Sequence, residues 1–122
     1  MPTYVTFFTY AREAWARMVD HPDDRAEASR KAIEGVGGQL KAFYWMLGPW
    51  DGFAVYSVPT QVAAASLGAG VAGSGRVAQQ QTFQVIDMEE ARQALELASA
   101  VARTYRPPGA PADWREGYDQ LG

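Results

Sequence analysis

Apolar and polar positions alternate along residues 39–58, QLKAFYWMLGPWDGFAVYSV, in two runs separated by the loop at 48–52. Alternate side chains of a strand lie on opposite faces of its sheet. Strict alternation places Leu40, Ala42, Tyr44 and Met46 on one face of the first run and Lys41, Phe43 and Trp45 on the other. Residues 53–58 alternate in the same way. The pattern predicts an antiparallel hairpin, apolar on both faces, in the middle of a small sheet.

The flanking segments predict two further strands and several helices. Residues 3–10 and 79–86 alternate like strands. A weakly helical stretch covers 11–19, and helical spacing runs from about 20 to 35, from 60 onward, and from 87 to about 103. The expected boundary signals are Pro22 in a first helical turn, the Gly37-Gly38 pair as a stop, Thr60 as an N-cap, and a capping box of Asp87 and Glu90.

The order of these elements is strand, helix, strand, strand, helix, strand, followed by one added helix. This order predicts an α+β class and a ferredoxin-like βαββαβ fold with a four-stranded antiparallel sheet. Helices cover only one face of such a sheet. We expect the other face to expose aromatic side chains from the set Tyr4, Phe8, Tyr10, Phe43 and Trp45. A patch of that size predicts a homodimer that packs sheet against sheet.

The chain is expected to consist of a folded domain and a C-terminal tail. Residues 1–104 are predicted to form the domain with its added C-terminal helix. Residues 105–122 are rich in proline and glycine and form a tail, which we expect to be ordered only if Trp114 and Tyr118 dock.

Composition excludes several classes of function. The chain has 122 residues, a net charge of −3 and no cysteine, and 48% of its residues are hydrophobic. These values fit one globular domain without disulfides or thiolate chemistry. The sequence has no block of basic residues, so we expect neither nucleic acid nor an anionic membrane as a partner. The N-terminus lacks a signal-peptide pattern and no run of residues is long enough for a membrane span, so we expect a soluble cytoplasmic protein.

Three segments together resemble the GYD domain family of bacterial proteins. They are the opening MPTYVTFFTY, the block AEASRKAIEGVGGQLKAFYWMLGPWDGFAVYSVP, and the alanine-rich helix that follows. Gly48, Trp50 and Asp51 occupy the family's Gly-x-Tyr-Asp turn, with tryptophan in place of tyrosine, while Gly117-Tyr118-Asp119 matches only by letter. The family is similar to the dimeric α/β-barrel superfamily, which implies that fold and a dimer. Cofactor-independent monooxygenases and cyclases occur in that superfamily.

Two residues are candidates for proton transfer. His21 is the only histidine, and an imidazole exchanges protons near neutral pH. It nevertheless falls at a predicted helix N-terminus, where capping or simple exposure is the commoner explanation. Asp51 lies in the hairpin loop, where a carboxylate acts either as a general base or, more commonly, as a turn residue that accepts backbone N–H groups. The acids around His21 suit a helix N-terminus, so we expect no metal.

Aromatic residues and one arginine are candidates for ligand contact. The set is Tyr10, Trp15, Tyr44, Met46, Trp50, Tyr56 and Arg76. Core and dimer packing is the competing explanation for the aromatic residues, as simple solvation is for the arginine. Residues 68–73 match GxGxxG, but the dinucleotide fingerprint needs a strand before it, so we interpret them as a glycine-rich helix end and expect no cofactor.

Two functions therefore remain open. The first is a homodimer that binds a hydrophobic aromatic or polyketide-like molecule, as a cofactor-independent monooxygenase or cyclase that uses His21 or Asp51. The second is a non-catalytic binding or assembly module, whose aromatic faces serve only the contacts between copies.

Overall fold

The computed structural model describes residues 1–115. Its elements follow the expected order. They are β1 (Thr3–Tyr10), α1 (Arg12–Asp20), α2 (Arg25–Gly35), β2 (Gln39–Trp45), β3 (Gly52–Ser57), α3 (Gln61–Gly73), β4 (Val77–Val85) and α4 (Met88–Thr104).

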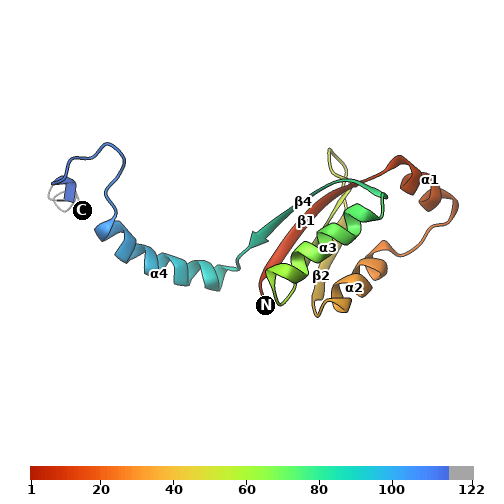
Figure 1. Ribbon diagram of the computed structural model, residues 1–122, viewed down its shortest axis with the longest axis horizontal. Coiled ribbons are helices and arrows are strands. Elements are labelled where there is room, and N and C mark those ends of the chain that lie inside the picture. Colours follow the sequence, from red (N-terminus) through yellow and green to blue (C-terminus); the bar gives the residue numbers. More distant parts are fainter. Residues whose placement is uncertain (116–122) are drawn as a thin grey trace. The chain divides into compact units, whose positions relative to one another are not determined.

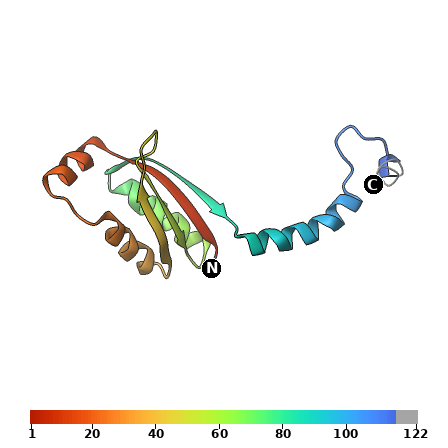
Figure 2. The same ribbon diagram turned by 180° about the vertical axis from the view of Figure 1, so that it is seen from behind.

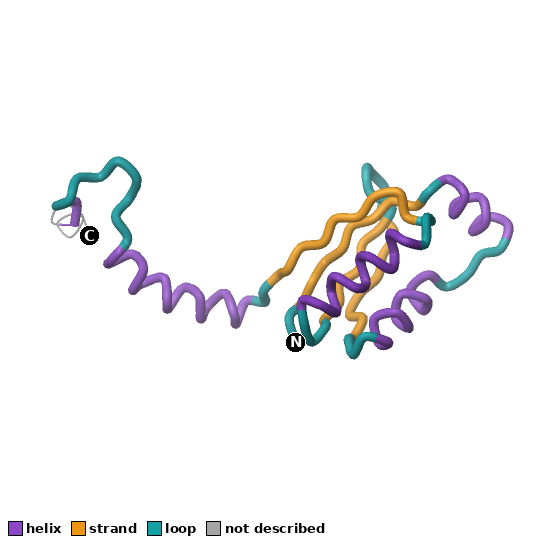
Figure 3. The backbone as a smooth tube through the Cα atoms, viewed as in Figure 1, coloured by secondary structure: helices purple, strands orange, loops and turns teal. Residues whose placement is uncertain are grey.

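The four strands form one antiparallel sheet in the order β2-β3-β1-β4. Helices α2 and α3 both lie against the same face of this sheet (Figures 1 and 2). The backbone trace in Figure 3 shows the two helices side by side over the strands. The ferredoxin-like α+β fold predicted from the sequence is thereby confirmed.

A β-bulge in β2 overturns the predicted assignment of faces. Leu40 pairs with Tyr56 and Ala42 with Val55, so Lys41 is an extra residue without a partner in β3. One extra residue in a strand reverses the alternation beyond it. Phe43 and Trp45 therefore share the helix-covered face with Leu40, whereas Ala42 and Tyr44 lie on the opposite face. The prediction of a single face for Leu40, Ala42 and Tyr44 was wrong because it assumed an uninterrupted strand.

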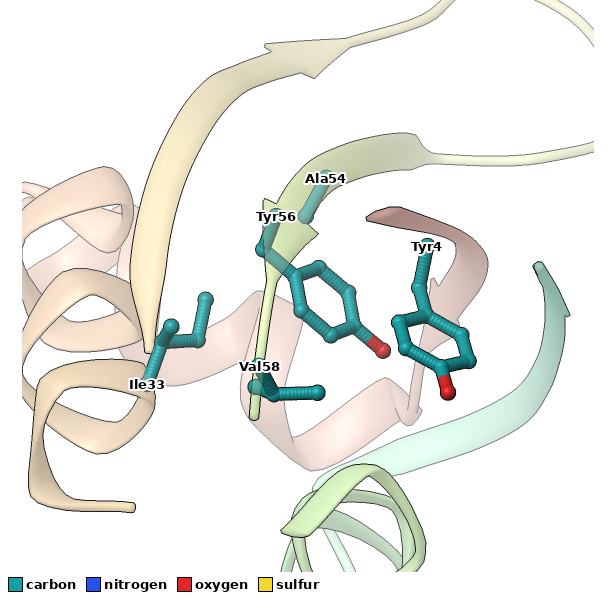
Figure 4. Packing of buried hydrophobic residues seen from close by; sticks show 5 residues of the cluster. All are labelled: Tyr4, Ile33, Ala54, Tyr56 and Val58. Atoms are coloured by element: carbon teal, nitrogen blue, oxygen red, sulfur yellow. The ribbon is translucent and has the colours of Figure 1, made fainter. Parts of the chain in front are cut away.

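The core lies between the sheet and its two helices. Tyr4, Ala54, Tyr56 and Val58 are buried there with Ile33 of α2. The rings of Tyr4 and Tyr56 lie alongside each other with centroids 6.0 Å apart (Figure 4). Phe8 and Tyr10 are buried in a second cluster with Ala14. The aromatic residues expected on the uncovered face thus lie on the helix-covered one, so that expectation is also corrected.

A different aromatic set occupies the face of the sheet that α2 and α3 leave uncovered. We call this the open face; its ring cluster consists of Phe7, Tyr44, Trp50, Phe53 and Phe83. Phe7 is at its centre, with ring centroids 5.9 to 6.3 Å from three of the others. Tyr44 and Phe83 remain 62% and 50% exposed. The two-sided apolar character of the sheet is real, although the residues that provide it differ from those expected.

The boundaries of the helices follow local capping chemistry. Asp24 caps α2 by accepting a hydrogen bond from the backbone N–H of Glu27, and Thr60 caps α3 in the same way through Ala63. Pro22 lies before the cap of α2, so its expected place in the first helical turn was wrong. After α2 the chain turns at Gly37, whose φ of +84° is a conformation that glycine adopts without strain.

The hairpin loop is closed by a glycine that no larger residue could replace. A Cβ at Gly52 would lie 2.7 Å from both the ring of Phe8 and the carbonyl oxygen of Tyr44. Close packing leaves no room for such an atom. The turn therefore holds Phe8 tightly beneath the start of β3.

Residues from Ile86 onward form a second unit, which includes α4. The expected capping box of Asp87 and Glu90 is present. None of the described side chains of α4 is buried. In the described part of the chain, no helix is both long enough and apolar enough to cross a membrane. Trp114 is half-buried, whereas Tyr118 and the Gly117-Tyr118-Asp119 triplet lie outside the described residues.

Candidate functional site

A cavity lies inside the domain, between the helix-covered face of the sheet and helices α2 and α3. Its volume is about 120 Å³. We call it the inner cavity; its apolar lining includes Phe8, Ile33, Phe43, Ala54, Leu67 and Val77. These residues come from all four strands and from α2 and α3, so the cavity is built by the fold as a whole.

The inner cavity exists because α3 has a glycine where it faces the sheet. Ala64 packs on the core, and Gly68 follows it one turn later on the same side of the helix. A Cβ added at Gly68 would meet no atom within 4 Å. A position that points at the sheet and meets nothing marks a void. The glycine-rich sequence, which matches a nucleotide-binding motif by spacing, thus leaves space between α3 and the sheet.

Three hydroxyl groups line the inner cavity on the sheet side. Thr6 Oγ1 lies 2.8 Å from both the Tyr56 hydroxyl and Thr82 Oγ1. We call these three groups the hydroxyl chain. Two hydrogen bonds use two of its three protons, so one O–H remains available to donate to a ligand. The nearby Gln80 side chain instead donates to the carbonyl of Gly68, at 2.8 Å.

A second, wider space adjoins the inner cavity. We call it the outer basin; it has a volume of about 690 Å³ and lies between α1, α2 and α3. Its lining includes Arg17, His21, Asp23, Arg25 and Arg76. Tyr10 and Arg25 line both spaces, so they stand where the two meet.

Tyr10 and Arg25 belong to one polar network at this junction. Trp45 Nε1–H donates to the Tyr10 hydroxyl at 3.2 Å, and Arg25 is paired with Asp23 at 3.0 Å. Burial raises the pKa of Tyr10 above its usual value, so its phenol stays protonated near neutral pH. Burial alone would lower the pKa of Arg25, but its hydrogen bond to Asp23 and the charge of that residue raise it. Arg25 is therefore a permanent cation at the entrance to the inner cavity.

Four of the residues predicted from the sequence come together at this site. Tyr56 lines the inner cavity, His21 and Arg76 line the outer basin, and Tyr10 lines both. They come from two strands, the segment between α1 and α2, and the turn before β4. These four residues are far apart in the sequence, so the sequence alone did not indicate that they lie close together.

The other predicted ligand-contact residues lie elsewhere. Tyr44 and Trp50 belong to the open face, on the opposite side of the sheet from both spaces. Trp15 packs edge-on against Tyr10 and Trp45, with ring centroids 5.2 Å apart in each case. It therefore contacts a residue of the site without lining either space. Met46 is half-buried in the hairpin loop, where its backbone N–H donates to the carbonyl of Asp51.

Asp51 has a structural contact. One carboxylate oxygen accepts a hydrogen bond from the backbone N–H of Tyr10 at 2.8 Å, and its own N–H donates to the carbonyl of Phe8 at 2.9 Å. Asp51 lines neither the inner cavity nor the outer basin. The residue joins the hairpin loop to the end of β1, a structural contact with another strand in place of the local turn contact that was expected.

Sequence reasoning missed the residues that give the site its polarity. Thr6 and Thr82 are ordinary strand residues in the sequence, and only the pairing of β1 with β4 brings them opposite each other. Arg25 was hidden among the helix-start acids, although a half-buried arginine is itself a signal of function. In residues 1–115, no cluster of three or more metal-binding side chains is present.

Fold and cavity together define a ferredoxin-like α+β domain with an apolar pocket between its sheet and its helices. A model of the GYD domain matches residues 4–95. The chain therefore belongs to the GYD domain family, as its resemblance suggested. A search of curated proteins found no match to the chain.

Proposed function

We propose that this GYD domain protein binds a small hydrophobic molecule in the inner cavity and acts as a homodimer joined through its open face. The observation that carries the proposal is the void opposite Gly68, which is lined by apolar side chains and by a hydroxyl chain with one O–H left to donate. Ligand sites commonly combine an apolar lining with a few placed polar groups.

The dimer follows from the open face. Its five rings and the neighbouring Val5 and Val55 leave an apolar surface that α2 and α3 do not cover. A second copy of the same face is a matching partner, because two-fold symmetry brings identical apolar patches together. The homodimer then uses one face of the sheet and the ligand the other.

The proposal extends to catalysis through His21. This side chain lines the outer basin, and an imidazole is suited to accept a proton from a ligand held at Tyr10 and Tyr56. The reaction class is a cofactor-independent oxygenation or cyclisation of an aromatic or polyketide-like substrate. Asp51 is left out because its carboxylate holds the backbone of β1. In this scheme His21→Ala abolishes turnover of a substrate and preserves its binding.

A cavity-filling variant tests the binding. Gly68→Leu adds a side chain towards the void, while Gly73→Leu adds one at another open position that lines neither the inner cavity nor the outer basin. Both replacements raise helix propensity by up to about 1 kcal/mol, so both should fold. With toluene as the probe in a 15N–1H NMR titration, we expect Gly68→Leu to weaken binding roughly tenfold or more and Gly73→Leu to leave it unchanged.

Equal effects of the two leucines, or no saturable binding of toluene to the unaltered protein, would contradict the proposed pocket.

A second candidate function rests on α4. Its apolar positions include Ala91, Leu95, Ala98 and Val101, and no described side chain of the helix is buried. An amphipathic helix without a covered face suits an assembly module that docks on a neighbour. Deleting residues 106–122, which follow α4, tests whether the C-terminal tail takes part in this docking. Loss of assembly with toluene binding intact favours docking, and loss of binding in an intact dimer favours a lid.

A further inference from the structure

The inner cavity and the outer basin adjoin each other. Besides Tyr10 and Arg25, they share Ala32, Leu67, Val71 and Val77 as lining residues. A molecule with its body in the inner cavity would therefore extend past Arg25 into the basin. The chemistry of the basin then decides which end group such a molecule carries.

Positive charge collects around the basin in a chain that is acidic overall. Arg17, Arg25 and Arg76 face one carboxylate, Asp23, so the lining carries a net charge of +2 while the whole chain carries −3. Asp23 pairs with Arg25, and no ion pair within 4 Å involves Arg17 or Arg76 in residues 1–115. Glu13 lies beside these two arginines in an adjoining hollow. Even with Glu13 included, the surroundings remain positive and favour an anion.

The size of the inner cavity restricts the body of the ligand. Its volume is about 120 Å³. Apolar protein cavities of about 150 Å³ hold one benzene molecule. One ring therefore fills most of the inner cavity, and the remainder of the molecule lies in the basin.

We propose that this site takes a small aromatic carboxylate, with its ring in the inner cavity and its carboxylate on Arg25 at the entrance to the basin. This inference rests on the proposed function and adds the charge of the ligand to it. The planar guanidinium of Arg25 offers five N–H donors, of which Asp23 occupies one through Nη1. The remaining donors match the two oxygens of a carboxylate, the geometry that arginine binds best.

The experiment compares two probes of the same size and ring, of which only one carries a charged end group. They are 3-phenylpropanoate and its uncharged amide, 3-phenylpropanamide, each titrated at pH 7 against the full-length protein by 15N–1H NMR. We expect the carboxylate to bind roughly tenfold or more tightly than the amide. Arg25→Gln should remove this preference and change the affinity for the amide by less than about twofold.

Arg30→Gln is the matched control. Arg30 lies on the same helix, pairs with Glu27 at 3.2 Å, and lines neither space. The Arg30→Gln variant should leave the affinities for both probes unchanged. An Arg76→Gln variant removes a positive charge from the outer basin and leaves the lining of the inner cavity unchanged. It should weaken binding of the carboxylate and leave binding of the amide unchanged.

The outcomes separate this inference from the proposed function. Equal affinities for acid and amide, or a preference that survives Arg25→Gln, would overturn the carboxylate assignment and leave the apolar pocket standing. Failure of both probes and of toluene to bind would overturn the pocket and this inference with it.

Discussion

Asp51 shows how a single side chain can position a site that it does not touch. Its carboxylate accepts the backbone N–H of Tyr10, the residue at the junction of the inner cavity and the outer basin. The same interaction ties the hairpin loop to the last residue of β1. The orientation of Tyr10 in the site therefore depends on a contact made through its backbone.

Removing this carboxylate should destabilise the fold. Asp51→Ala leaves a part-buried N–H without its acceptor, which costs about 1 to 3 kcal/mol in the free energy of unfolding. Asp51→Asn retains an oxygen acceptor and should cost less. Urea unfolding measures both. Asp20→Ala, at an exposed position, is the control and should change stability by less than about 0.5 kcal/mol.

If Asp51→Ala proved as stable as Asp20→Ala, the positioning role would be lost, and a reactive role for the carboxylate would become the better explanation.

The elements were predictable from the sequence because their signals are local. The alternation in residues 3–10, the caps at Thr60 and Asp87, and the stop at Gly37 all depend on neighbouring residues. The assignment of faces failed at Lys41 because a bulge is defined by the partner strand, which the sequence of β2 alone does not reveal. The prediction of the site residues was incomplete for the same reason. The bulge places Tyr44 on the open face, and only the register of β1 with β4 brings Thr6 opposite Thr82.

The bulge makes a prediction about deletions. Removing Lys41 restores simple alternation and keeps every other residue of β2 on its observed face. The protein should therefore fold with a loss of about 0.5 to 1.5 kcal/mol, the net contribution of one hydrogen bond such as that from Lys41 to Thr3. Deleting Tyr44 instead shifts Trp45 and the loop relative to β3 and should cost several times more. Thermal unfolding followed by circular dichroism compares the two deletions.

Equal losses from the two deletions would mean that Lys41 is part of the regular pairing, contrary to the bulge.

At the scale of the whole molecule, the two faces of one sheet carry different features. The helix-covered face encloses the inner cavity, and the open face presents the ring cluster around Phe7. Residue types alone could not divide the aromatic residues between these faces, because both faces are rich in them. Only the position of the bulge decides that Trp45 lies on the helix-covered face and Tyr44 on the open face.

A charge on the open face should therefore separate the copies. Phe83→Glu places a carboxylate at a half-exposed ring position, and in a two-fold dimer that charge would be buried on both sides. We expect a monomer by sedimentation velocity. Val62→Glu, at a 78% exposed position on α3, is the control and should remain a dimer.

A dimer that survives Phe83→Glu, or a monomer in the unaltered protein, would show that the open face serves another purpose.

The most direct test of the account is a crystal structure of the protein grown with 3-phenylpropanoate. The account predicts density for the ring among Phe8, Phe43 and Leu67, the carboxylate on Arg25, and two copies in contact through their open faces. An inner cavity without the ring, or the ring bound instead against Phe7 and Phe83 on the open face, would contradict it.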